Sequence, residues 1–203
     1  MTTSIRHIII AIMVFFTVNA YAQTPEGTAT IRKGWNLNLK TNTLYDFAGC
    51  PNIGVDVRKD CWAFQTDWIF AWWNHPATHH YYSNYGIQSE IRYYVPQWKH
   101  QHVGLYGHLV TYDFEFGGVG HLARKLKDSF GIGAAYGYEI YLTADLNLDF
   151  TVGLGYFQSR YDKYEPSYFN SAYYRTATGT LRYFGPTRLE VGLIWKLKPQ
   201  FKK

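Results

Sequence analysis

The stretch LNLDFTVGLGY, residues 146–156, alternates between apolar residues and polar or small ones along its whole length. Leucine, phenylalanine, valine and tyrosine fill every second position, while asparagine, aspartate, threonine and glycine fill the positions between them. Successive side chains of a β-strand point to opposite faces, so this order gives one apolar face and one polar face. We therefore predict a strand over these residues.

The same two-residue period recurs in other segments of the chain. The period is strong in residues 62–72, where tryptophan and phenylalanine occupy most of the even-numbered positions. Such repetition predicts an all-β chain of eight strands, an even number as single-chain bacterial barrels require. The predicted strands cover residues 35–45, 53–57, 62–72, 87–95, 103–112, 130–140, 146–156 and 189–197.

The N-terminus has the features of a secretory signal peptide. Arg6 precedes an apolar stretch over residues 8–18, and the small-residue pattern Ala20-Tyr21-Ala22 follows it. This stretch is shorter than the roughly 18 apolar residues that a transmembrane helix needs. We predict a signal peptide over residues 1–22, cleaved after Ala22, and one exported domain over residues 23–203. An uncleaved membrane anchor is the alternative.

Composition favours strands and disfavours a nucleic-acid partner. Aromatic residues make up 19% of the chain and charged residues 17%, against about 25% charged in a typical soluble domain. The formal net charge of +5 forms no basic stripe, and an exported chain does not meet cytosolic nucleic acid. We therefore exclude nucleic acid as a partner.

The alternation alone fits two architectures: a membrane barrel with its apolar face outward, and a soluble sandwich or lipocalin-like barrel with that face inward. Linker lengths favour the membrane barrel, because short turns and long loops alternate in outer-membrane barrels. The linkers near residues 59–60, 96–101 and 143–144 are short, and those over 74–82, 114–128 and 158–182 are long. Aromatic residues near the segment ends also resemble interfacial girdles. They are Trp62, Trp72, Tyr93, Tyr156 and Trp195.

We therefore predict a single eight-stranded, antiparallel, up-and-down transmembrane β-barrel in the cell outer membrane of a Gram-negative bacterium. Its polar face would then line the lumen. The charged residues predicted to face inward are Lys40, Asp56, Asp67, Glu90, Arg92, Glu139, Asp149, Arg188, Glu190 and Lys196. Side chains fill the interior of an eight-stranded barrel, so we expect these charges to pair and close the lumen. An ion or proton path is the alternative.

Small residues on the inward parity predict room for long side chains opposite them. These residues are Gly104, Gly131, Gly133, Gly153 and Gly155. Cys50 and Cys61 invite a disulfide in an exported chain, but an extended strand between them would hold them too far apart. We expect no bridge unless that segment folds back.

The last predicted strand carries a pattern that resembles the signal read by the outer-membrane assembly machinery. Glu190, Gly192, Trp195 and Leu197 fit polar-x-Gly-x-x-aromatic-x-hydrophobic. Such signals commonly stop near a terminal aromatic residue, whereas here Phe201 is followed by two lysines.

Several short motifs are spread over nearly the whole predicted domain. They are LKTN at residues 39–42, LYD at 44–46, PNIG at 51–54, YDKY at 161–164 and YFGPT at 183–187. With these motifs the chain resembles a family of outer-membrane barrels from Bacteroidetes that is filed as a domain of unknown function. The resemblance implies the same eight-stranded barrel and genes often found near those for surface fimbriae. It supplies no catalytic residues.

Candidate catalytic and metal-binding residues are few. His75, His79 and His80 cluster in one linker, where we expect solvated side chains, and His108 should make a structural hydrogen bond. His121, Ser129 and Glu139 form a conceivable hydrolase trio, but their spacing fixes no mutual geometry. We predict no catalytic residue, no metal and no cofactor.

The linker over residues 158–182 is rich in aromatic residues and suits contact with a protein or glycan partner. The predicted contact residues are Tyr161, Tyr164, Tyr168, Phe169, Tyr173 and Tyr174. The alternative is that the linker prolongs two strands, with aromatic side chains packed across a hairpin. The sequence favours a non-enzymatic barrel with a structural or surface-interaction role, with fimbrial or envelope components as the candidate partners. An outer-membrane lipid hydrolase or acyltransferase and a narrow channel are the alternatives.

Overall fold

The computed structural model describes residues 34–75, 80–98, 100–116, 121–166 and 173–197. Residues 31–203 form one compact unit, distinct from residues 1–30. The predicted signal peptide and its cleavage site lie outside the described residues. No described helix is long and apolar enough to cross a membrane.

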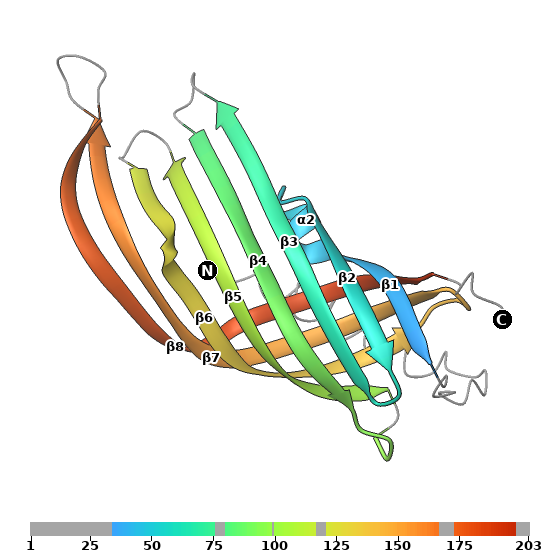
Figure 1. Cartoon of the computed structure of the whole chain (residues 1–203). Helices are drawn as coiled ribbons and strands as arrows, with labels where there is room; N and C mark the ends of the chain where they lie inside the picture. Colours follow the sequence, from blue (N-terminus) through green and yellow to red (C-terminus); the bar gives the residue numbers. More distant parts are fainter. Residues whose placement is uncertain (1–33, 76–79, 99, 117–120, 167–172, 198–203) are drawn as a thin grey trace, which may run out of the picture. The chain divides into compact units, whose positions relative to one another are not determined.

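Eight antiparallel strands form one closed ring, in which each strand pairs with its neighbour in the chain and β8 returns to β1 (Figure 1). The strands are β1 (Trp35–Asn42), β2 (Asn52–Lys59), β3 (Trp62–His75), β4 (His80–Tyr94), β5 (Gln101–Phe116), β6 (His121–Tyr141), β7 (Leu146–Pro166) and β8 (Tyr173–Lys196). All eight predicted segments contribute to this ring, so the all-β prediction with eight antiparallel strands is confirmed.

One predicted strand end is wrong. The first strand was expected to reach residue 45, but it ends at Asn42, and Thr43–Phe47 form the short helix α2. The Asn42 side chain accepts a hydrogen bond from the Leu44 amide at 3.1 Å, which caps the helix. The helix cap therefore ends the strand at Asn42, although the alternating pattern predicted a strand as far as residue 45.

The three predicted long loops are also wrong. Strands β3 to β8 continue through most of these linkers, and only residues 76–79, 117–120 and 167–172 separate the strands of each hairpin. The linkers are rich in tyrosine, threonine and phenylalanine, which favour extended backbone and pack across strands. The turns at 60–61, 95–100 and 142–145 are short, as expected.

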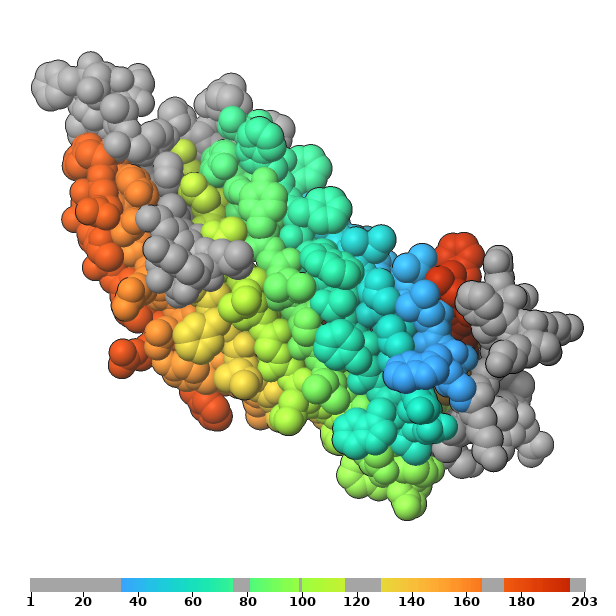
Figure 2. Space-filling view, viewed as in Figure 1, coloured from blue at the N-terminus to red at the C-terminus, as the bar shows by residue number. Residues whose placement is uncertain are grey.

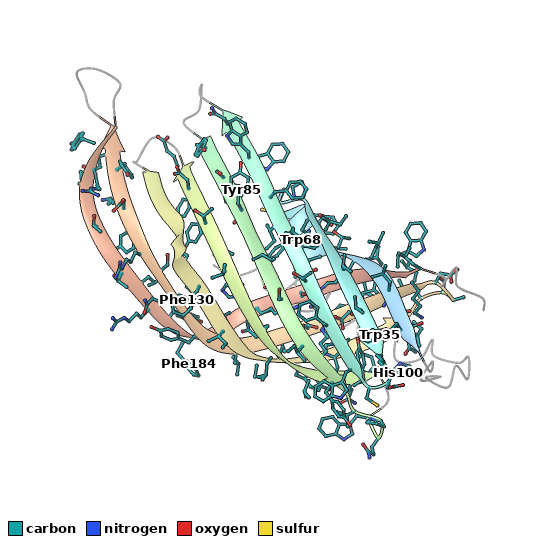
Figure 3. All side chains as sticks on the ribbon, in the orientation of Figure 1. Trp35, Trp68, Tyr85, His100, Phe130 and Phe184 are labelled. Atoms are coloured by element: carbon teal, nitrogen blue, oxygen red, sulfur yellow. The ribbon has the colours of Figure 1, made fainter. Side chains whose placement is uncertain are left out.

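The outer surface of the ring is apolar. Leu105 on β5 is 69% exposed and Ile132 on β6 is 62% exposed, although both lie in the middle of regular strands. Trp68 and Phe184 likewise lie on the outer side of the wall (Figure 3). Figure 2 shows this outer surface over β3, β4 and β5 as a continuous layer of side chains. The polarity of an ordinary soluble barrel is therefore reversed.

Candidate functional site

The alternating residues of the strands bring charged side chains into the interior of the ring. All nine residues that the sequence analysis placed in a charge network are buried. They are Lys40, Asp56, Asp67, Glu90, Arg92, Glu139, Asp149, Arg188 and Glu190. Together with Arg58 and His102, which pair with them, we call these residues the interior network. Lys196, also expected to face inward, is only half-buried, and its Nζ lies 4.5 Å from the ring centroid of Tyr141.

One part of the interior network surrounds Glu190. Its carboxylate lies 2.5 Å from Lys40 Nζ and 2.5 Å from Arg188 Nη2. Lys40 also contacts Asp67 at 3.0 Å, and Arg188 contacts Glu90 at 2.7 Å. Two cations therefore link three carboxylates from β3, β4 and β8. With its amide oxygen oriented toward Arg188, the Gln88 side chain also accepts a hydrogen bond from this guanidinium.

Arg92 is the central cation of the network. Its guanidinium is fully buried and lies 2.6 Å from Glu90 and 2.7 Å from Asp149. It also donates to Thr151 Oγ1 at 3.3 Å. His102 Nε2 lies 2.8 Å from the other oxygen of Asp149. Arg92 thus connects the carboxylates of β4 and β7 across the ring.

A further part of the network lies near the end of the ring that carries the short turns. Arg58 contacts Asp56 at 2.6 Å and Glu139 at 3.0 Å. Tyr94 donates to Glu139 at 3.0 Å, and Asn147 also donates to this carboxylate. Each of these side chains has at least one polar partner, as buried charges require, while Asp56 Oδ2, Arg58 Nη2 and Asn147 Oδ1 have no hydrogen-bond partner among the described residues.

The sequence analysis missed Arg58 and His102. Arg58 shares the parity of Asp56 on β2, so the alternation carried a signal for it. His102 precedes the segment that we predicted as a strand, and its partner Asp149 lies 47 residues away. Only the register of β5, β6 and β7 brings these two side chains together.

Inward glycines make room for the long side chains, as expected. A Cβ atom on Gly153 would lie 2.6 Å from Tyr106, and one on Gly131 would collide with the imidazole of His108. Tyr106 itself is buried and is hydrogen-bonded to Thr187. The glycines of β6 and β7 therefore form the surface against which aromatic residues of β5 pack.

The Gly153→Ala variant should lose about 1–3 kcal/mol of unfolding free energy, because overpacking forces the Tyr106 ring to move. The matched control is Gly107→Ala, whose Cβ would meet only the Gly131 carbonyl at 3.7 Å. Equilibrium unfolding in urea measures both variants. Equal losses in the two would show that the contact with Tyr106 does not set the cost.

The predicted partner-contact residues lie on the β7–β8 hairpin. Tyr161 packs over Gly179, Tyr164 is half-buried, and Tyr174 is exposed. Tyr173 pairs with Pro166 at the strand ends, while Tyr168 and Phe169 lie outside the described residues. The structure therefore shows the prolonged hairpin that the sequence analysis held as the alternative to a loop.

Three residues of the predicted assembly signal, Glu190, Gly192 and Trp195, lie on β8, and Leu197 directly follows this strand. Glu190 and Gly192 are buried. Trp195 and Leu197 are exposed on the outer face. An amphipathic last strand has this arrangement, with polar and small residues on one face and apolar residues on the other.

The structure does not assemble the conceivable hydrolase trio. Ser129 is hydrogen-bonded to Ser159 at 2.6 Å, while Glu139 lies ten residues farther along the same strand and pairs with Arg58. The side chain of His121 is outside the described set. His108 stacks near Tyr106, with 6.2 Å between the ring centroids. The structural hydrogen bond expected for His108 is not formed at its Nδ1, which is buried without a partner in the described part of the chain.

Metal and disulfide chemistry find no site in the described part of the chain. No group of three or more histidine, cysteine or acidic residues there could hold a metal ion. Residue 79 and the side chains of His75 and His80 lie outside that part. Cys50 and Cys61 are both free, and the Cys50 thiol lies 3.3 Å from the Tyr82 hydroxyl.

Comparison with known families gives one match. Residues 8–197 match the model of a family described as "Protein of unknown function (DUF3575)". No curated protein and no solved structure matches the chain. The match covers the whole ring and carries no catalytic assignment.

Proposed function

Because the chain belongs to the DUF3575 family, whose description names no activity, we propose its function from the structure: a small, closed β-barrel of the bacterial outer membrane with a non-enzymatic role at the cell surface. In this proposal, residues 1–22 direct export. The barrel anchors the β7–β8 hairpin, which contacts a protein or glycan partner. Bacteroidetes as the source and a fimbrial or envelope partner belong to the same proposal.

The reversed polarity of the ring carries this proposal. Apolar side chains are exposed on the outside and charged ones are buried inside, which is unfavourable in water and favourable in a bilayer. On β3 the outward aromatic band runs from Trp62 to Trp72. At about 3.3 Å per residue and a tilt near 40°, this band is roughly 25 Å tall, the height of the apolar band of outer-membrane barrels.

The interior supports a closed anchor over a channel. Arg92 and Arg188 link carboxylates from strands on different sides of the ring, and these side chains are buried. Water and ions would have to break these pairs to pass. We therefore expect no steady conductance in planar bilayers.

The two ends of the ring differ in how far the strands extend, and this difference sets the proposed orientation. At one end β3 to β8 continue past the helix α2 that follows β1, most of all in the 21-residue β7 and the 24-residue β8. In bacterial barrels the shorter connections face the periplasm and the longer ones the outside, so the β7–β8 hairpin would face the outside.

Epitope insertion tests this orientation. A tag inserted between Pro166 and Tyr173 should bind antibody on intact cells. The matched control carries the tag between Thr143 and Ala144, in a short turn at the opposite end, and should bind antibody only after permeabilisation. Labelling of both or of neither on intact cells would contradict the proposed display.

A further inference from the structure

One side of β8 has no partner strand along most of its length. β8 has 24 residues, whereas β1 has only 8 and pairs with β8 over residues 192–196 alone. Among the described residues, no strand pairs with residues 173–190 on this side of β8 (Figure 1). On the other side, β7 pairs with β8 in regular register from Ala177 to Pro186. We call residues 177–183, on the side away from β7, the free edge.

The backbone just beyond the last pair of β1 and β8 is bonded to side chains. That last pair is Asn42 with Gly192, and Val191 is the next residue of β8. The Val191 amide donates to Asn42 Oδ1 at 3.3 Å, and its carbonyl accepts from Thr43 Oγ1 at 2.8 Å. Two side chains thus take the place of a partner strand at this residue. Both backbone groups of Val191 therefore point away from β7.

The direction of the backbone along β8 also shows which other residues point away from β7. In an antiparallel strand, the amide and carbonyl of one residue point to the same neighbouring strand, and those of the next residue point to the opposite side. The Leu154 carbonyl lies beside Gly133 of β6, so Leu154 points to β6. Its partner on β8, Pro186, therefore points away from β7. Proline fits this position, because it has no amide to donate to a strand.

Three residues of the free edge direct their amide and carbonyl groups to the unpaired side. They are Thr178, Thr180 and Arg182, which follow from Pro186 in steps of two because the register is regular here. Every residue from 174 to 184 except Gly179 is exposed. Threonine, tyrosine and phenylalanine in this stretch favour extended backbone. A long, regular and exposed edge of this kind is a template for a further strand.

Under the proposed function, on which this step rests, the free edge lies outside the bilayer. The outward residues Leu189 and Phe184 are apolar and 61% and 79% exposed, whereas the outward Arg182 and Thr180 beyond them are polar. An unpaired strand edge cannot face hydrocarbon, because its backbone groups would lose their hydrogen bonds. Both observations favour a position in water at the cell surface, where another protein can reach the free edge.

The surroundings of the free edge are positively charged. Residues 158–183 carry four positive and two negative side chains, which gives a net charge of +2. The positive residues are Arg160, Lys163, Arg175 and Arg182, and the negative ones are Asp162 and Glu165. Arg182 belongs to the free edge, and Arg160 pairs with Thr180 on the neighbouring strand. A strand with acidic side chains therefore suits this edge.

The two described ends of the domain lie far from the free edge. β1 begins at Trp35, which pairs with Lys59 beside the turn at 60–61. β8 ends at Lys196, whose amide donates to the Asp145 carbonyl in the turn at 142–145. Both turns belong to the end of the ring opposite to the free edge. The geometry therefore favours a separate chain as the partner over the segments that adjoin these two ends.

The opening beside the free edge is also too narrow for a second copy of this protein. Lower in the ring, β1 and β2 lie between β8 and β3, so the base of the opening spans three inter-strand spacings, roughly 14 Å. In a second copy, β8 is paired with β7 and brings the rest of its wall with it. A single extended segment fits the opening, and a whole barrel does not.

We propose that the free edge of β8 binds an extended, acidic peptide segment of a partner protein by strand addition. The segment takes the position that a longer β1 would occupy. Its backbone bonds to the amide and carbonyl groups of Thr178, Thr180 and Arg182, and its acidic side chains face Arg182. Main-chain hydrogen bonds supply the affinity in this mode of recognition, and side chains supply the specificity.

Peptide binding tests this proposal on the full chain reconstituted in phospholipid vesicles. The probe is a fluorescent nine-residue peptide in which threonine alternates with glutamate. Two further forms carry N-methyl groups on the threonines or on the glutamates, which removes the amide hydrogens of one side of the strand. We expect one methylated form to bind about tenfold or more weakly and the other to stay within about threefold of the unmodified peptide. Equal losses in the two forms, or no binding of the unmodified peptide, would overturn strand addition.

A matched pair of variants tests the same edge on the protein. Thr180→Pro removes an amide on the unpaired side and leaves the bonds to β7 in place, and Gly179 before it tolerates a following proline. It should weaken peptide binding about tenfold, whereas Thr180→Ala keeps the amide and should change binding less than twofold. Equal affinities of these two variants would contradict the proposal. If Thr180→Pro does not fold, Arg182→Glu replaces it, and this variant should bind a lysine-containing peptide in preference to the glutamate one.

The outcomes separate strand addition from the proposed function. Peptide binding to the purified protein, but to cells only after permeabilisation, would support strand addition and overturn the proposed orientation. Absence of binding to a protein that fractionates with the outer membrane would overturn strand addition alone. A dimer that Thr180→Pro dissociates would identify a second copy as the occupant, and tighter peptide binding after deletion of residues 23–33 would identify the chain itself. Either result would overturn the separate partner.

Discussion

Replacing Arg92 with methionine is expected to cost about 3–5 kcal/mol of unfolding free energy or to prevent folding, because it leaves buried carboxylates without their cation. Arg92 is fully buried and contacts Glu90 and Asp149 at 2.6 and 2.7 Å. Few cations are available to replace it. The described interior network contains six carboxylates and only four lysines and arginines to pair with them. The carboxylates are Asp56, Asp67, Glu90, Glu139, Asp149 and Glu190, and the cations are Lys40, Arg58, Arg92 and Arg188.

Urea unfolding of the protein in phospholipid vesicles, followed by tryptophan fluorescence, measures this loss. The matched control is Arg182→Met, because Arg182 is exposed on the outer face of β8. Its effect should stay within about 0.5 kcal/mol. Similar stabilities for the two variants would show that the interior pairs do not hold the ring together.

Replacing Ile132 with arginine is expected to destabilise the protein in a bilayer by about 2–4 kcal/mol. Ile132 is 62% exposed on the outer face, where it pairs with Gly107 on β5 and Tyr156 on β7. In a soluble barrel, a charge at so exposed a position would change stability by about 0.5 kcal/mol or less. The same substitution therefore separates the two environments.

Unfolding of the vesicle-bound protein at increasing urea concentration also measures this change in the free energy of unfolding. Thr180→Arg is the control, since Thr180 is exposed on the outer face of β8 and pairs with the exposed Arg160 of β7. We expect the control to match the unchanged protein. No difference between Ile132→Arg and the control would contradict a lipid-facing wall.

Alternation was enough to predict the number of strands and which residues of a strand share a face, because parity along a strand is a local property. It therefore grouped Lys40, Arg92 and Glu190 with the other residues of the polar faces, and the linker lengths and the aromatic residues near the segment ends were needed to assign those faces to the interior. It could not show which carboxylate each cation meets. The pairing of Arg188 with Glu90, 98 residues away, depends on the register of strands that meet only in the folded ring.

The errors have equally specific causes. Asn42 caps a helix that the apolar pattern did not reveal. The long linkers were interpreted as loops because their alternation mixes tyrosine with polar residues, although Pro76 directly follows the last residue of β3 and Gly117 directly follows the last residue of β5 in the sequence. β1 is short because the helix cap ends it at Asn42, which the strand pattern did not predict.

The most direct test of the membrane barrel is the fractionation of cells that express the full chain, followed by electrophoresis with and without boiling. We expect the protein in the outer-membrane fraction and expect it to migrate faster unheated than boiled, because the closed ring stays folded in detergent. A soluble periplasmic protein whose migration does not change on boiling would contradict the reversed polarity as a sign of membrane insertion, and with it the proposed function.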